Sequence, residues 1–170
     1  MKEELTFYEC QRFNHWWLVV MMVVINGLFI YGCIIQLVFK KSFGNNPMDD
    51  IALVVVAVSF ALFTVSFLFV RLDTVIDKDG VYEQMFPFQL RFQFTPWEYI
   101  ADASVIKTNP IGKFGGWGIK YGFRKKSYTM SGCYVLQLKL NNDKKIFIGT
   151  QRPEELADFL NKLNADRKQE

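Results

Sequence analysis

Two long apolar runs without a charged residue constrain this chain more than any other feature of its sequence. Residues 16–39 contain 20 apolar residues among 24, and residues 51–70 contain 17 among 20. A helix of about 20 residues spans roughly 30 Å, which is the thickness of the hydrocarbon core of a bilayer. We therefore predict transmembrane helices over 16–39 and 51–71, in a chain that is not wholly soluble.

A cleaved signal peptide is the alternative explanation of the first run. The preceding residues 1–15 carry more acidic than basic side chains, and the apolar run is longer than the core of a signal peptide. No pair of small residues suited to cleavage precedes Lys40. Trp16 and Trp17 stand at the start of the run, where amphipathic rings favour the headgroup layer. The sequence favours a retained helix.

The link over 40–50 is short, so the two helices are expected to form an antiparallel hairpin with both ends on one side of the membrane. The link carries two cations, Lys40 and Lys41, and is expected to face away from the cytoplasm. The other side carries more cations near the helix ends, namely Lys2, Arg12, Arg71 and Lys78. The positive-inside rule then predicts a multi-pass protein of the cell (inner) membrane with both termini, including segment 1–15, in the cytoplasm.

Two polar side chains, Asn26 and Gln36, lie inside the first predicted helix. Ten residues separate them, which places them nearly on one helical face. In lipid each prefers a hydrogen-bond partner, so we expect contact with the second helix or with a second subunit. A transport pathway is the less favoured alternative, because neither apolar run, 16–39 or 51–70, contains an Asp, Glu, His, Lys or Arg residue.

After Arg71 the helical pattern gives way to short alternating runs separated by turn residues. Leu90, Phe92 and Phe94, for example, alternate with polar residues and predict one apolar strand face. Seven antiparallel strands are expected, over 74–77, 81–86, 90–94, 98–107, 117–123, 134–140 and 144–149. An amphipathic helix over 153–163 follows, with its apolar stripe at Leu156, Phe159, Leu160 and Leu163. The predicted fold is therefore α+β, with a sandwich or barrel over 72–164, a capping helix and a polar tail over 165–170.

This plan resembles the pleckstrin-homology-like (PH-like) fold, in which seven strands precede a capping C-terminal helix. The segment FGGWGIKYGFRKKSYTMSGCYVLQLKLNNDKKIFIGTQRPEELADFL is similar to the end of bacterial PH-like domains, many of which adjoin a transmembrane hairpin. The resemblance covers about residues 72–164, and its motifs describe a fold rather than an activity. It implies a bacterial membrane protein of a largely uncharacterised kind.

The sequence offers no combination of residues that is typical of catalysis. His15 is the lone histidine and adjoins the first apolar run, while the cysteines Cys10, Cys33 and Cys133 are scattered without metal-ligand spacing. The glycines near Gly115 lack the spacing of phosphate or dinucleotide loops. A net charge of +3 is far below that of a nucleic-acid-binding protein. We predict a protein that is not an enzyme and that uses no cofactor or metal.

A run of three cations, Arg124–Lys126, is the segment with the most binding potential, and we expect it in a loop at the end of a strand. Together with Lys113 and Lys120 it forms a candidate contact for anionic lipid headgroups or for a partner. The alternative is a solvated turn whose charges keep a strand edge soluble. The first predicted hairpin, where lipid-binding PH domains usually carry their cations, is net negative here at Asp77, Lys78 and Asp79.

Two functions are therefore carried forward. The first is a membrane-anchored, non-enzymatic interaction or scaffold module on the cytoplasmic face, which binds a protein partner or a second copy of itself. The second is a module that binds or senses anionic lipids through Arg124–Lys126. The bilayer is an expected partner in both, and nucleic acid in neither.

Overall fold

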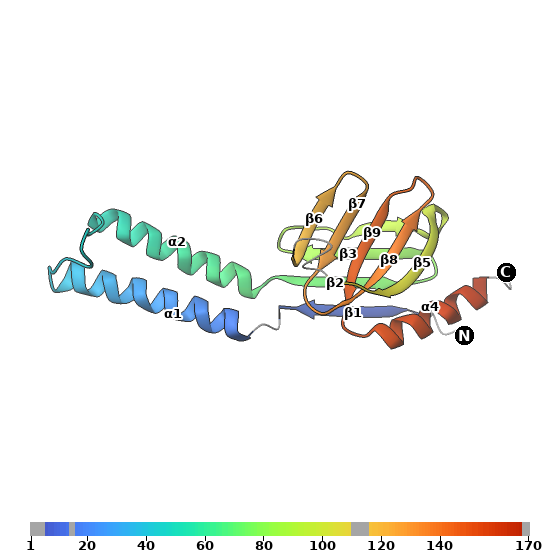
Figure 1. The fold of residues 1–170 in the computed structure, drawn as a ribbon, viewed down its shortest axis with the longest axis horizontal. Coiled ribbons are helices and arrows are strands. Elements are labelled where there is room, and N and C mark those ends of the chain that lie inside the picture. Colours follow the sequence, from blue (N-terminus) through green and yellow to red (C-terminus); the bar gives the residue numbers. More distant parts are fainter. Residues whose placement is uncertain (1–5, 14–15, 110–115, 168–170) are drawn as a thin grey trace. The chain divides into compact units, whose positions relative to one another are not determined.

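The computed structural model describes residues 6–13, 16–109 and 116–167, in two compact units. One unit, Asn14–Phe69, is helical. The other combines Met1–Phe13 with Val70–Glu170 and is rich in β-strands (Figure 1). The helical unit is thus an insertion in the sequence of the β-rich unit, which we call the β-unit.

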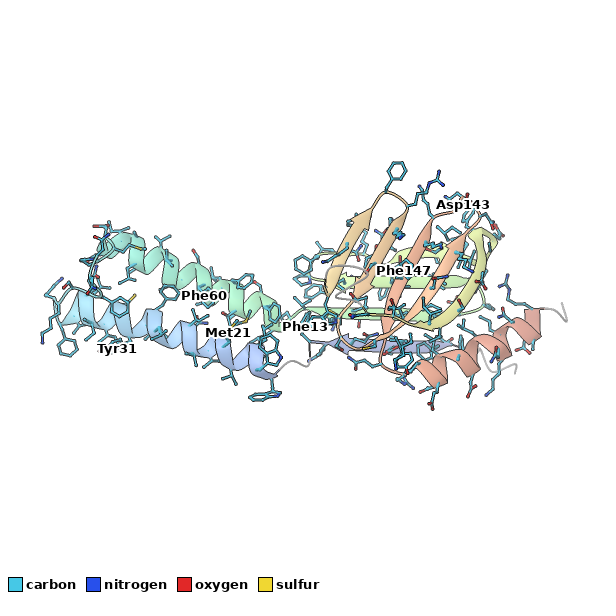
Figure 2. The ribbon with its side chains drawn as sticks, in the orientation of Figure 1. Phe13, Met21, Tyr31, Phe60, Asp143 and Phe147 are labelled. Carbon is cyan, nitrogen blue, oxygen red and sulfur yellow. The ribbon has the colours of Figure 1, made fainter. Side chains whose placement is uncertain are left out.

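The helical unit contains two long apolar helices. Helix α1 (Trp16–Cys33) continues into a π-helical segment η1 (Ile34–Val38), and α2 (Asp50–Leu68) begins after Asp49, whose side chain accepts a hydrogen bond from the amide of Ile51 at 3.2 Å. Both helices are long and apolar enough to cross a membrane. In each, only 11% of the most apolar window is buried, and many apolar side chains point outward (Figure 2). The core helix of a soluble protein would be mostly buried, so this exposure is compatible with a lipid environment.

The β-unit consists of two sheets and a C-terminal helix. The four-stranded sheet has the order β1-β2-β3-β4, and the five-stranded sheet has the order β5-β8-β9-β7-β6 (Figure 1). The strands are β1 (Phe7–Arg12), β2 (Arg71–Ile76), β3 (Gly80–Phe86), β4 (Gln93–Pro96), β5 (Ile100–Lys107), β6 (Gly118–Gly122), β7 (Lys125–Thr129), β8 (Tyr134–Leu140) and β9 (Lys145–Thr150). A 3₁₀ segment, η2 (Trp97–Tyr99), joins the two sheets, and α4 (Pro153–Arg167) follows the last strand.

Strand β1 precedes the helical unit but pairs with β2, which follows it. The register is antiparallel and runs from Phe7 opposite Ile76 to Arg12 opposite Arg71. The sequence interpretation treated 1–15 as a segment apart and missed this strand. Its signal is weak because two of the three side chains that β1 buries are polar, namely Glu9 and Gln11.

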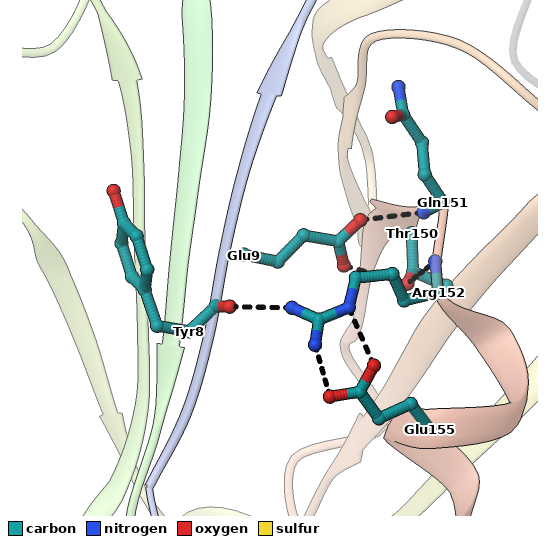
Figure 3. A network of polar contacts seen from close by, with 6 residues as sticks. All are labelled: Tyr8, Glu9, Thr150, Gln151, Arg152 and Glu155. Carbon is teal, nitrogen blue, oxygen red and sulfur yellow. Dashed lines mark hydrogen bonds and ion pairs between the residues drawn. The ribbon is translucent and has the colours of Figure 1, made fainter.

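A polar network attaches β1 to the start of α4 (Figure 3). The Glu9 carboxylate accepts hydrogen bonds from Thr150 Oγ1 at 2.8 Å and from the amide of Gln151 at 2.7 Å. Arg152 donates to the carbonyl of Tyr8 at 3.1 Å and forms an ion pair with Glu155. Because Glu9 and Thr150 are both almost fully buried, these bonds form in a low-dielectric environment and tie the strand before the helices to the last strand of the chain.

The strand count differs from the seven that the alternation predicts. The described residues contain nine strands, of which β1 and β7 were not expected, and they form two sheets rather than a closed barrel. Strand β7 was missed because it opens with two lysines and buries Ser127 and Thr129, so no apolar alternation marks it. The expectation of uniformly antiparallel pairing is also wrong, since β7 and β9 are parallel.

The core lies between the two sheets and α4. It combines Leu72, Ile76, Val81 and Met85 from the first sheet with Leu136, Leu138 and Ile148 from the second and Leu156, Leu160 and Leu163 from α4. The predicted helix and its apolar stripe are confirmed, with Phe159 partly buried against this core. Helix α4 extends four residues beyond the predicted end.

The predicted strand over 90–94 is only partly correct. Strand β4 begins at Gln93, so Leu90 and Phe92 lie in the loop before it, where both are exposed. The preceding hairpin agrees with its Asp-Gly signal, because Asp77 Oδ1 accepts hydrogen bonds from the amides of Asp79 and Gly80. A side chain at Gly80 would collide with the carbonyl of Thr95, so the close approach of β4 requires glycine there.

Candidate functional site

The β-unit contains a cleft of about 580 Å³ beside strand β4. One wall consists of β4 and Tyr99. The other walls come from the five-stranded sheet, at the β6–β7 turn and the β8–β9 turn. Two hairpin turns that are distant in sequence therefore meet the edge of the first sheet at one place.

Five cationic side chains line this cleft. Three come from the β6–β7 hairpin and two from the start of β9, namely Arg124, Lys125, Lys126, Lys144 and Lys145. The strand register sets Lys125 directly opposite Lys145. Like charges in such positions repel each other and destabilise a sheet. The arrangement thus costs stability in the absence of an anion, and an anionic group bound in the cleft would offset that cost.

The five cations are not neutralised by neighbouring acids. None of them forms an ion pair with a carboxylate in the part of the chain that the structure describes. Lys126 lies over the ring of Tyr121, with 5.7 Å from its Nζ to the ring centroid. By contrast Lys139, the neighbour of Lys145 on β8, is paired with Asp102 at 2.7 Å. The cations without a carboxylate partner are thus those of the cleft lining, whereas the neighbouring Lys139 outside the lining is paired.

A single acidic residue, Glu83 on β3, belongs to the lining. It is 2% exposed, and its Oε2 has no hydrogen-bond partner among the residues that the structure describes. Burial raises the pKa of Glu83 to about 8, and the charge of Lys126 opposes that rise only in part. At neutral pH the side chain is mostly protonated, so it adds little negative charge and offers an O–H donor to a ligand.

Glu83 belongs to a polar row across the inner face of the first sheet. Glu9, Thr74 and Glu83 occupy adjacent positions on β1, β2 and β3, and all three are buried. Within the described part of the chain Thr74 Oγ1 has no hydrogen-bond partner, whereas Glu9 accepts hydrogen bonds from Thr150 and from the amide of Gln151. The unpaired polar atoms of the row thus lie toward the cleft side, and the paired ones toward α4.

The structure brings together three of the five predicted contact residues. Arg124, Lys125 and Lys126 all line the cleft, although only Arg124 lies in a turn and the two lysines begin β7. Lys120 lies on β6 and is not part of the lining, and Lys113 lies outside the described residues.

Sequence reasoning missed the other three charged residues of the lining. Lys144 and Lys145 form a second Lys-Lys pair after a polar turn, a signal that is visible in the sequence but not specific. Glu83 gave no signal, because its burial results from the packing of the two sheets.

The other two predicted residues lie in the helical unit. Asn26 Nδ2 on α1 donates to Thr64 Oγ1 on α2 at 2.9 Å and to the carbonyl of Met22 at 2.8 Å. Gln36 Nε2 donates to the carbonyl of Met48 at 2.6 Å and to Asp50 Oδ1 at 2.7 Å. Asn26 therefore joins α1 to α2, and Gln36 joins η1 to the start of α2 and to Met48 before it.

Comparison with known proteins yields one finding about the whole chain. The model of a family described as "Family of unknown function (DUF6141)" matches residues 2–165. No curated protein matches the sequence. The matched range contains β1, both apolar helices and the two sheets, so these parts occur together in the family as one unit of sequence.

Proposed function

Because this chain belongs to DUF6141, a family of unknown function, we propose its role from the chemistry of its two units. The protein is a membrane-anchored, non-enzymatic binding module. Its apolar helices span the membrane, and the β-unit binds a ligand that carries a phosphoryl group in the basic cleft. The observation that carries this proposal is the convergence around one cleft of five cations that form no ion pair with a carboxylate among the described residues.

The pairing of β1 with β2 supports the anchored topology. Arg12 ends β1 shortly before α1, and Arg71 begins β2 shortly after α2, yet the two are direct neighbours in the sheet. This pairing supports an arrangement in which the N-terminus of α1 and the C-terminus of α2 lie on one side of the membrane, because one small sheet contains both adjoining strands. The excess of cations on that side favours the cytoplasm.

The layered architecture supports the likeness to PH-like domains. Two packed sheets are followed directly by a C-terminal helix that buries Leu156, Leu160 and Leu163 in their shared core. The additional β1 and the parallel β7–β9 pair are departures from the simple seven-strand plan. The PH-like assignment thus stays a proposal about fold and carries no ligand with it.

The chemistry of the cleft favours a phosphoryl group over a singly charged anion. Arginine and lysine together can donate several hydrogen bonds to the oxygens of one phosphate, and the repulsion between Lys125 and Lys145 decreases most with a multiply charged ligand. Protonated Glu83 can donate one further bond from the floor of the cleft. A volume near 580 Å³ suits a small molecule or a headgroup.

The cleft lies at the end of β6 that is remote from Phe13, the last described residue before the helical unit. Phe13, which follows β1 in the direction of α1, lies against Trp117 at the start of β6, with 6.4 Å between the ring centroids. The cleft adjoins the other end of β6, at Gly122. A strand of this length spans about 16 Å, so within the β-unit the cleft lies about that distance from Phe13, the last described residue before the helical unit.

The test uses the full chain in phosphatidylcholine nanodiscs, with inorganic pyrophosphate as the probe and isothermal titration calorimetry as the measurement. Arg124→Ala combined with Lys145→Ala is expected to weaken binding by about 10- to 30-fold, since each cation near an anionic group contributes about 1 kcal/mol. Lys162→Ala, on the exposed surface of α4, is the matched control and should bind like the wild type. Absence of pyrophosphate binding, or an equal loss in the control, would contradict the proposal.

A second arm distinguishes the source of the phosphate. Phosphatidic acid, whose headgroup is a phosphomonoester, is included in the same nanodiscs. Competition with pyrophosphate would identify a lipid headgroup as the ligand, and unchanged affinity would identify a soluble phosphorylated molecule. Binding of a protein partner or of a second copy stays a prediction, which crosslinking of the full chain in mild detergent can test.

A further inference from the structure

The loop between β3 and β4, residues 87–92, exposes three large apolar side chains. Phe88 is 70% exposed, Leu90 is 78% exposed, and Phe92 is 46% exposed. Single exposed apolar residues are common on soluble proteins, but three at alternate positions of one short loop form a cluster that requires an explanation. We call this cluster the apolar loop.

The apolar loop is held in a defined shape by Gln89, the residue between two of its exposed side chains. The Gln89 amide donates to the carbonyl of Met85 at 2.8 Å, and its Oε1 accepts a hydrogen bond from the Met85 amide at 3.1 Å. Gln84 Nε2 donates to the Gln89 carbonyl at 3.1 Å. Gln89 is thus bonded back onto β3, while Phe88 and Leu90 point away from the domain.

The apolar loop lies at the end of the sheet where the chain meets the apolar helices. Phe86, the last residue of β3, is paired with Arg71, and Arg71 is paired with Arg12. Helix α2 ends at Leu68, three residues before Arg71. The apolar loop therefore begins directly after Phe86, which pairs with Arg71, the first residue of the strand that follows α2.

Cationic side chains accompany this end of the sheet. Arg12, Arg71 and Arg91 are all exposed there, and the Arg71 guanidinium lies 5.6 Å from the centre of the Phe86 ring. A mixture of exposed aromatic or aliphatic side chains with arginines is typical of surfaces that lie in the headgroup region, where the rings enter the acyl boundary and the charges remain among phosphates.

We propose that the apolar loop is a third membrane contact, which inserts Phe88, Leu90 and Phe92 into the headgroup–acyl boundary of the bilayer that the helices cross. The inference rests on the anchoring part of the proposed function and is independent of the basic cleft. The occupant is the lipid surface because the loop adjoins Arg71, and only two residues separate Arg71 from the end of α2, so a short loop held there has the bilayer within reach. The contact would restrict the orientation of the β-unit on the membrane.

The test places an environment-sensitive nitrobenzoxadiazole label at single cysteines in the full chain, after Cys10, Cys33 and Cys133 are replaced by serine. Leu90→Cys reports on the apolar loop, and Val55→Cys, within α2, reports on membrane insertion of the helix. Ala165→Cys, exposed on α4, is the matched control for a position in water. Each variant is reconstituted in phosphatidylcholine nanodiscs, with and without lipid that carries a nitroxide quencher near the headgroup or deep in the acyl chain.

The expected result is quenching of the Leu90 label by the shallow nitroxide, at least about twofold stronger than at Ala165, because interfacial side chains lie about 5–10 Å into the boundary. The Val55 label should be quenched by the deep nitroxide. Quenching at Val55 with none at Leu90 overturns the proposed loop contact and leaves the anchor intact. Absence of quenching at Val55 overturns the anchor and with it this inference, while pyrophosphate binding by the cleft is decided separately.

Discussion

Replacement of Glu83 by glutamine is expected to remove a pH-dependent loss of stability from the β-unit. Glu83 is 2% exposed, and burial raises the pKa of its carboxyl to about 8 from a usual value near 4.5. The folded state therefore keeps a proton that the unfolded state releases. As pH rises from about 4.5 to about 8, the unfolded state is progressively favoured, so the free energy of unfolding decreases across this window.

The magnitude follows from the two pKa values. Within the window each pH unit is worth about 1.4 kcal/mol, and the effect levels off near either end, so the wild type loses roughly 3–4 kcal/mol between pH 5 and pH 8. A Glu83→Gln side chain has similar shape and cannot titrate. At pH 5 the two proteins should have similar stability, and at pH 8 the variant should be the more stable by that amount.

Urea unfolding of the full chain in detergent micelles, followed by the circular dichroism of the strands, measures the free energy of unfolding at each pH. The informative quantity is the difference between Glu83→Gln and the wild type, because every other titrating group contributes to both. Glu98→Gln removes a carboxylate that is exposed on η2 and serves as the matched control. A difference for Glu83→Gln that stays constant from pH 5 to pH 8 would refute the reasoning.

Three further results are expected. Glu9→Gln should lower the free energy of unfolding of the β-unit by about 1–3 kcal/mol, because the buried hydroxyl of Thr150 and the amide of Gln151 lose a carboxylate acceptor. Urea midpoints measure this change. Glu154→Gln, at an exposed position of α4, is the control and should change the midpoint little. Asn26→Leu and Thr64→Val should each lower the free energy of unfolding of the helical unit by about 0.6 kcal/mol, with no additional loss in the double variant, because the two side chains share one hydrogen bond. Unfolding by detergent titration measures these losses, and additive losses would contradict a shared hydrogen bond. Pyrophosphate affinity of the cleft should decrease as sodium chloride rises from roughly 0.05 to 0.5 M, because salt screens exposed charges, and affinity independent of salt would argue against an electrostatic site.

The parts of the fold that sequence predicts well are those with a long, repeated pattern. The two apolar runs predict α1 and α2, since about 20 uncharged residues in succession leave few alternatives to a helix in lipid. The amphipathic stripe of α4 is equally clear, because Leu156, Leu160 and Leu163 recur at helical spacing. Strands with alternating apolar residues, such as β8, follow for the same reason.

Strands that bury polar residues could not be found in this way. Strand β1 packs Glu9 and Gln11 inward, and β7 begins with Lys125 and Lys126, so neither shows the alternation that identifies a strand. Conversely, Leu90 and Phe92 show the alternation of a strand but lie in a loop. Strand β4 begins only at Gln93, and both side chains before it are exposed.

By itself the sequence determined that this protein has an apolar helical hairpin and a β-rich unit closed by a C-terminal helix. Those conclusions depend on local spacing, which the chain carries wherever it folds. Tertiary structure alone decided that β1 pairs with β2, although the whole helical unit separates them in sequence. It also decided that Lys144 and Lys145 meet Arg124 around one cleft and that Glu83, in the lining of that cleft, is buried. These features depend on pairings between residues far apart in sequence, and such pairings are set by the packing of the two sheets as a whole.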